Sequence, residues 1–147
     1  VLAGYTIPGN NVLVLGGGMT GVETAEFMAE HNRNVTVLEM RPDIALDESM
    51  IPRKFLMPRL AQKGVKKIVN ATVKSIHEDG VTYTVGDEET TINGFDSIVL
   101  ALGVKSYNPY EEQLRDCVKE LYVIGDAKQP GAANKATESA LQVATKI

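Results

Sequence analysis

The chain has 147 residues, of which 44% are hydrophobic and 23% charged, and its formal net charge is −4 at pH 7. This length and apolar content are enough for one domain with a buried core. The mild acidity, without a block of basic residues, argues against a nucleic-acid surface, and no apolar run is long enough to span a membrane.

Cysteine content and the first residues suggest where the protein works. The chain has one cysteine, Cys117, so it can form neither an internal disulfide nor a cysteine-rich metal cluster. We therefore expect a reducing, cytoplasmic setting and no metal. The sequence begins at Val1 without a methionine or a signal-peptide pattern, and we expect it to be a piece of a larger protein.

A glycine-rich turn lies between a predicted strand and a predicted helix. The apolar run Val12 to Leu15 is typical of a buried parallel strand, and glycines at 16, 18 and 21 follow it as G-x-G-x-x-G. An amphipathic helix is expected from about Met19 to His31. In such a turn Gly16 allows the sharp bend, Gly18 lets the backbone approach a pyrophosphate, and Gly21 lets the helix pack closely. The helix N-terminus also presents free N–H groups to phosphates, so the stretch predicts a nucleotide site.

An acid ends the second predicted strand. Val35 to Leu38 is apolar, and Glu39 follows it, 18 residues beyond Gly21. A carboxylate near this spacing can accept hydrogen bonds from both hydroxyls of an adenosine ribose. It would repel a 2′-phosphate, whereas Arg41 could pair with one. Because Glu39 is the better placed of the two, the pair favours a dinucleotide without a 2′-phosphate.

The next segment predicts a helix that enters at Pro52, with Asp47 or Ser49 as its N-cap. Pro58 cannot donate a backbone hydrogen bond, so we expect it to kink or divide this helix. Phe55 and the other apolar residues of the helix are predicted to lie in the core.

The rest of the chain completes a sheet and adds a second, antiparallel one. A short strand is expected at 66–69, three short antiparallel strands over 71–92, and buried strands at 97–103 and 121–127, before a helix over 134–147. Together these elements predict an α/β fold. It is a Rossmann-like parallel sheet of four or five strands flanked by helices, with a three-stranded antiparallel β-meander.

With these motifs placed, the sequence resembles the flavoproteins that carry two dinucleotide-binding domains, the pyridine-nucleotide and disulfide oxidoreductase superfamily. The run Gly16 to Phe27 is most similar to the NADH-binding portion of multi-domain Old Yellow Enzyme-like reductases, such as 2-enoate reductase, dienoyl-CoA reductase and trimethylamine dehydrogenase. Further matches are Val37 to Met40, the meander followed by Leu100 to Gly103, and Val123 to Ala127. The resemblance covers essentially the whole chain.

The resemblance implies a particular domain organisation. Members of the superfamily have one glycine turn for FAD and another for NAD(P)H, whereas this chain has one. Residues 1–147 are therefore expected to be an NAD(P)H-binding domain, of which 121–147 resemble the returning C-terminal part of a FAD domain. FAD would belong to the full-length protein, together with missing FAD and substrate domains, and the isolated chain would lack turnover. The strand expected at 121–124 could pair with this sheet or with another copy, which would give a homo-oligomer.

The resemblance also implies which residues bind cofactors. The glycine turn would hold the pyrophosphate and Glu39 the adenosine ribose, Met40 and Arg41 would flank the adenine, and Asp126 would contact flavin. With Glu39 at the ribose, the resemblance implies NADH rather than NADPH. The full predicted set is Gly16, Gly17, Gly18, Met19, Thr20, Gly21, Glu39, Met40, Arg41, Val73, Ala101, Leu102, Gly103, Gly125 and Asp126. No side chain is predicted to act as a catalytic acid, base or nucleophile, because the cofactors carry hydride transfer from NADH to flavin.

Two alternatives stay open. The glycine turn could bind FAD and make the chain a compact flavin domain, because FAD domains of the family also run from glycine turn to acid, meander and Gly-Asp. The purified protein would then be yellow. The chain could instead be a non-catalytic nucleotide-sensing or assembly module whose oligomeric state depends on nucleotide.

Overall fold

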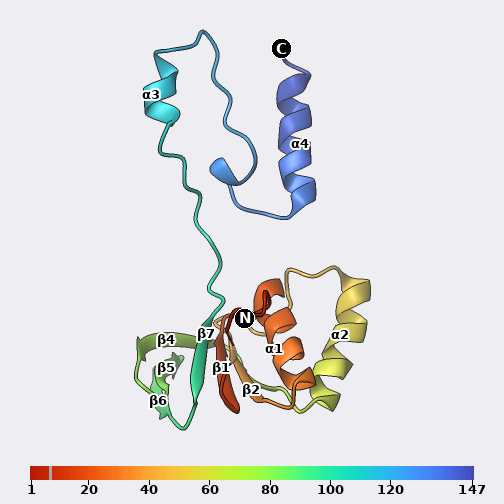
Figure 1. The fold of residues 1–147 in the computed structure, drawn as a ribbon, viewed down its shortest axis with the longest axis vertical. Helices are drawn as coiled ribbons and strands as arrows, with labels where there is room; N and C mark the ends of the chain where they lie inside the picture. The colour runs from red at the N-terminus through yellow and green to blue at the C-terminus, as the bar shows by residue number, and fades with distance from the viewer. Residues whose placement is uncertain (7) are drawn as a thin grey trace. The chain divides into compact units, whose positions relative to one another are not determined.

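The computed structural model describes residues 1–6 and 8–147. It divides into two compact units, Val1–Gly103 and Val104–Ile147, shown in Figure 1. Each unit is described by itself, and the first contains both sheets.

A four-stranded parallel sheet is the centre of the first unit. Its strands lie in the order β3-β2-β1-β7, so β1 has a neighbour on each side. Leu13 of β1 is paired with Thr36 of β2 and with Ile98 of β7. The strands are β1 (Asn11–Leu15), β2 (Asn34–Leu38), β3 (Lys66–Ile68) and β7 (Ser97–Leu100). The parallel sheet predicted from the sequence is confirmed, with four strands.

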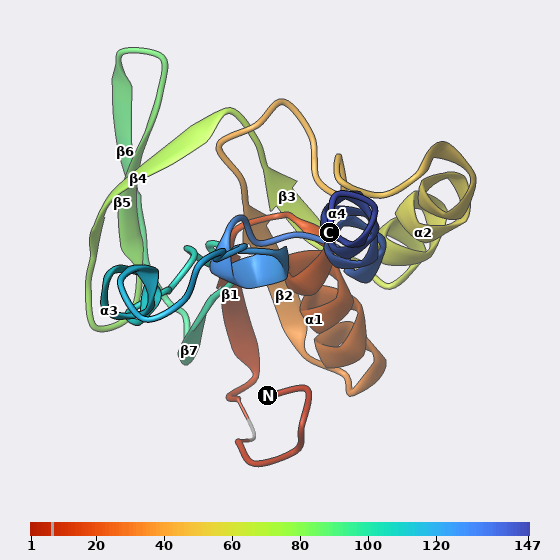
Figure 2. The same ribbon diagram turned by 90° about the horizontal axis from the view of Figure 1, so that it is seen from above.

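Two helices, α1 (Met19–Glu30) and α2 (Met50–Gln62), cover one face of this sheet, as Figure 2 shows. Alternate strand residues point to opposite faces, so Val12 and Val14 face the helices. The core there is formed by Val12, Val14, Val22, Ala25, Met28, Val35, Val37, Ile44, Ala45, Leu56 and Leu60.

Helix α2 differs from its prediction in two ways. It is a single helix that continues through Pro58, so the proline does not divide it. Phe55 is 63% exposed, and its predicted core position is wrong, because the buried face of α2 is the one with Leu56 and Leu60. A single exposed aromatic residue is common on a protein surface.

The other face of the parallel sheet is covered by the β-meander, whose three strands are antiparallel in the order β4-β5-β6. The strands are β4 (Ala71–Ile76), β5 (Val81–Val85) and β6 (Glu88–Ile92). A second core lies between the two sheets and consists of Leu13, Leu15, Leu38, Ala71, Val81 and Tyr83. The meander predicted from the change to a period of two is therefore confirmed.

The second unit contains α3 (Glu111–Arg115), a 3-10 turn η1 (Gly125–Ala127) and α4 (Ala133–Ala144). The predicted strand over 121–127 is wrong. Ile124 is extended, with φ −133° and ψ 167°, but joins neither sheet, and the chain then turns at Gly125. A strand needs a neighbour to pair with its backbone, and the Gly125 N–H bonds the Ser139 hydroxyl instead. Across residues 1–6 and 8–147, no helix combines the length and apolarity that a membrane span requires.

Candidate functional site

The glycine turn lies at the carboxyl end of β1, where the strand passes into α1. Gly16 has a φ of +103°, a left-handed conformation that favours glycine. Its N–H donates to the Leu38 carbonyl at 2.8 Å, and the Ala101 N–H donates to the Leu15 carbonyl at 2.8 Å. Backbone hydrogen bonds therefore hold the turn to the ends of both neighbouring strands, β2 and β7.

Two further glycines of the turn have no room for a side chain. A Cβ on Gly21 would overlap the carbonyl oxygen of Gly16. A Cβ on Gly17 would lie 2.5 Å from Ile44 Cγ2 and 3.0 Å from Glu39 Cβ. Helix α1 therefore starts directly against the turn, which matches the close packing expected of Gly21.

Glu39, at the end of β2, reaches the glycine turn. Its Oε2 accepts a hydrogen bond from the Gly17 N–H at 2.5 Å, and its Oε1 accepts from the Arg41 N–H at 2.9 Å and from Arg41 Nε at 3.0 Å. The residue is only 6% exposed. Burial alone would raise its pKa, but these donated hydrogen bonds and the Arg41 charge outweigh it and hold the pKa below the ordinary value. Glu39 is therefore an anion at neutral pH.

Arg41 connects Glu39 to a second acid, Asp47. One guanidinium nitrogen, Nη1, pairs with Asp47 Oδ1. The other carboxylate oxygen, Oδ2, accepts a hydrogen bond at 3.1 Å from the backbone N–H of Met19, the first residue of α1. Asp47 thus caps α1, whereas Ser49 holds the N-cap position of α2.

Sequence reasoning did not include Asp47 in the site. It offered Asp47 as a cap for the helix that follows it, because caps are normally sought next to their helix. One signal was available: the N-cap position of α1 is Gly18, which has no side chain to cap the helix. The sequence could therefore show that α1 needs a cap from elsewhere, but not which residue supplies it.

The structure brings most of the predicted residues to the carboxyl edge of the parallel sheet. The glycine turn, Glu39 to Arg41, and Ala101 lie there together. Met40 is 69% exposed and Leu102 is 67% exposed, so both side chains are accessible to a ligand.

Three predicted residues lie elsewhere. Val73 is in β4 and packs against the core between the two sheets. Gly125 and Asp126 belong to the second unit, where Asp126 Oδ1 accepts a hydrogen bond from the Gly131 N–H at 3.3 Å.

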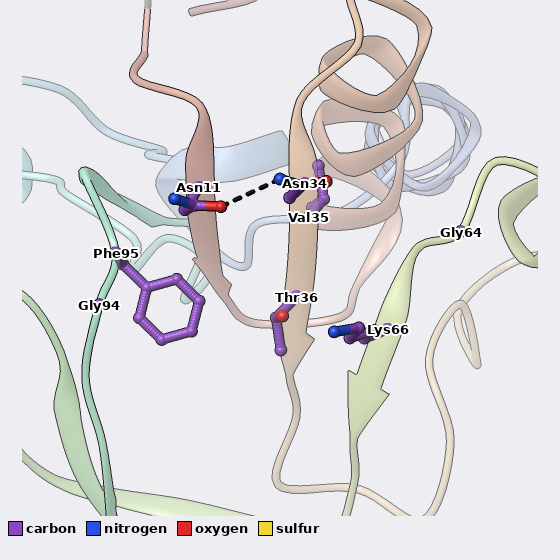
Figure 3. A pocket seen from close by; sticks show the side chains of 8 residues that line it. All are labelled: Asn11, Asn34, Val35, Thr36, Gly64, Lys66, Gly94 and Phe95. Atoms are coloured by element: carbon purple, nitrogen blue, oxygen red, sulfur yellow. Dashed lines mark hydrogen bonds between the residues drawn. The ribbon is translucent and has the colours of Figure 1, made fainter.

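A pocket of about 370 Å³ lies at the opposite, amino end of the parallel strands, as Figure 3 shows. Asn11 and Asn34 begin β1 and β2, and the Asn34 side-chain amide donates to Asn11 Oδ1 at 3.0 Å. The lining residues are Asn11, Asn34, Val35, Thr36, Gly64, Lys66, Gly94 and Phe95. None of the predicted site residues lines this pocket. Open α/β sheets bind their ligands at the carboxyl ends of the strands, so the glycine turn remains the candidate site.

Among the described residues, no three histidine, cysteine, aspartate or glutamate side chains are placed to hold a metal ion. Cys117 is an exposed thiol that contacts the Gln113 carbonyl at 3.2 Å.

The chain matches a known protein family over most of its length. The model of the pyridine nucleotide-disulphide oxidoreductases matches residues 3–140. The chain belongs to this family. The resemblance predicted from the sequence is thus confirmed.

Relatives within the pyridine nucleotide-disulphide oxidoreductases include the NADH oxidase of Thermoanaerobacter brockii, which is 34% identical over 137 residues, or 92% of this chain and 21% of that protein. The bilirubin reductase of Mediterraneibacter gnavus is 31% identical over 140 residues, or 94% of this chain and 22% of that protein. The structure of 2-naphthoyl-CoA reductase with 2-naphthoyl-CoA superposes with a TM-score of 0.82 at 28% identity, over 99% of this chain and 22% of that one. The chain therefore spans about a fifth of the length of these relatives.

Proposed function

We propose that this chain is the NADH-binding module of a larger FAD-dependent oxidoreductase, in which it presents the nicotinamide for hydride transfer to flavin. The observation that carries the proposal is the 2.5 Å hydrogen bond from the Gly17 N–H to Glu39 Oε2. It links the turn that would bind the phosphates to the acid that would bind the ribose, at the carboxyl edge of the sheet, where such folds bind dinucleotides.

The residues of the turn fit the two ends of an adenosine diphosphate group. The first N–H groups of α1 have no acceptor within the helix and can bind phosphate oxygens. Glu39 Oε2 accepts one hydrogen bond from the protein and keeps a lone pair for a ribose hydroxyl. The exposed side chain of Met40 can cover the adenine.

The charges around the turn support NADH over NADPH. Glu39 is ionised, and an anion at the ribose position repels a 2′-phosphate. Arg41 could offset this repulsion, but its Nε is bound to Glu39 and its Nη1 to Asp47. The name of the Thermoanaerobacter brockii relative, an NADH oxidase, agrees with this preference.

The flavin and the substrate would be bound by other parts of the full-length protein. The cofactors carry the hydride chemistry, and this chain supplies position. Ala101, Leu102 and Gly103 would approach the nucleotide from the end of β7, and Gly125 and Asp126 would contact the FAD.

The test is isothermal titration of the purified chain with NADH, NADPH and FAD, after its visible absorbance has been checked for bound flavin. We expect saturable NADH binding that Glu39→Ala weakens by about tenfold, the scale of a lost charged hydrogen bond. Glu23→Ala is the matched control, because Glu23 is an exposed glutamate on α1. Tight FAD binding without NADH binding would assign the turn to flavin. Nucleotide-dependent oligomerisation without flavin reduction in the parent protein would instead indicate a sensing module.

A further inference from the structure

The Asp47 carboxylate lies over the glycine turn. Its Oδ2 is 3.1 Å from the Met19 backbone nitrogen, and a Cβ added to Gly18 would lie 2.8 Å from the same oxygen. Gly18 is the glycine at which the backbone is expected to approach a pyrophosphate. A carboxylate of the chain itself therefore occupies the place at which a ligand's negative charge is expected.

Arg41 lies over the same turn and holds Asp47 there. Its Nη1 pairs with Asp47 Oδ1, and its Nη2 is 3.8 Å from the position of a Cβ on Gly18. The other side of the guanidinium is fixed, because Nε bonds Glu39 Oε1 at 3.0 Å. Glu39, Arg41, Asp47 and the Met19 N–H thus form a continuous line of hydrogen bonds across the turn.

The Asp47 side chain can leave this position more easily than Glu39 can. It is 44% exposed, whereas that of Glu39 is 7% exposed. An exposed ion pair is weak because water and salt screen it, so a ligand phosphate can replace the carboxylate. Arg41 would keep its bond to Glu39 during this exchange.

We propose that Asp47 is a specificity-determining residue that competes with the phosphates of a dinucleotide for the Met19 N–H and the Arg41 guanidinium. The inference rests on the proposed function, because it requires the glycine turn to be the phosphate site. Asp47 lowers the affinity for phosphate-bearing ligands by repulsion and by occupying their donors. It also keeps Arg41 from pairing with a 2′-phosphate, so it disfavours NADPH more than NADH.

The experiment is isothermal titration of the purified chain and of its Asp47→Asn variant with ADP, NADH and NADPH. Asparagine keeps an oxygen that can accept from the Met19 N–H but removes the charge. We expect the variant to bind ADP about threefold or more tightly, the size of a charge effect at a helix N-terminus. The ratio of the NADPH to the NADH dissociation constant should fall as well.

Glu48→Gln is the matched control. Glu48 is the next residue of the same loop, and its carboxylate accepts from the Ser49 N–H and hydroxyl rather than from α1. This variant removes the same charge and should leave ADP binding unchanged. An equal gain in both variants would overturn the proposal, because it would reflect net charge alone. Asp47→Ser, which also removes the charge and has a shorter side chain, replaces Asp47→Asn if circular dichroism shows that the latter is unfolded.

The outcomes separate this inference from the proposed function. Wild-type binding of NADH and ADP that Asp47→Asn leaves unchanged or weakens would overturn the role of Asp47 alone. Absence of ADP binding by both proteins would overturn the glycine turn as a phosphate site, and the role of Asp47 with it.

Discussion

The Glu39 carboxylate and the Gly17 backbone N–H are joined by a buried hydrogen bond of 2.5 Å, although 22 residues separate them in the sequence. The bond connects the end of β2 to the turn that follows β1. The same contact therefore contributes to the fold and aligns two parts of the candidate site.

Glu39→Gln should remove a pH-dependent part of the stability. The folded pKa of Glu39 lies below the ordinary value of 4.5, so its ionised form stabilises the fold at pH values above about 4.5. This contribution is lost as the pH falls through the folded pKa. We expect the difference in unfolding free energy between wild type and variant, measured with urea, to be larger at about pH 7 than at about pH 3. Equal differences at both pH values would contradict this account.

Gly21→Ala should damage both the fold and the site. The added Cβ would overlap the Gly16 carbonyl oxygen and push α1 away from the turn. We expect a loss of about 1–3 kcal/mol in urea unfolding, as for overpacking, together with loss of NADH binding. Gly64→Ala is the control, because Gly64 has a φ of +73° but open space around it. It should lose about 1 kcal/mol to backbone strain and keep its NADH affinity.

Leu13→Ala should destabilise the chain by about 2–5 kcal/mol, because it leaves a cavity between the two sheets. Leu13 is completely buried there. Phe55→Ala removes a larger but mostly exposed side chain and should change stability by no more than about 0.5 kcal/mol. Thermal or urea unfolding of both variants measures the difference, and a larger loss at Phe55 would show that α2 is buried differently.

A chain that ends at Gly103 should fold and bind NADH. Residues 1–103 form a compact unit with its own core. This unit contains the glycine turn, Glu39 and Ala101. We expect a single cooperative unfolding transition and an NADH dissociation constant within about twofold of that of the whole chain. A non-cooperative transition, or loss of NADH binding, would show that 104–147 are needed.

Local patterns predicted much of this molecule because they depend on neighbours in the sequence. The run from Val12 to Leu15, the glycine turn and the amphipathic helix after it follow one another, and the structure contains each of them. The change of period at Ala71 likewise marks the meander, because an exposed sheet face requires alternation.

Contacts between distant segments could not be predicted from the sequence. Asp47 caps a helix that begins 28 residues earlier, and no spacing rule connects the two. The apolar run at 121–124 has the composition of a strand, but composition does not supply a partner. Phe55 shows the same limit, because its burial depends on which face of α2 meets the sheet.

The position of β7 beside β1 has a consequence for synthesis of the protein. Asn11 at the start of β1 bonds Asp96, which lies 85 residues later, just before β7. Because synthesis proceeds at about 5–20 residues per second, β7 is made several seconds after β1. Gly16 meets Ala101 only after that time. We therefore expect nascent chains that end before β7 to lack a complete NADH site. NADH should stabilise the folded chain against unfolding only after β7 has emerged.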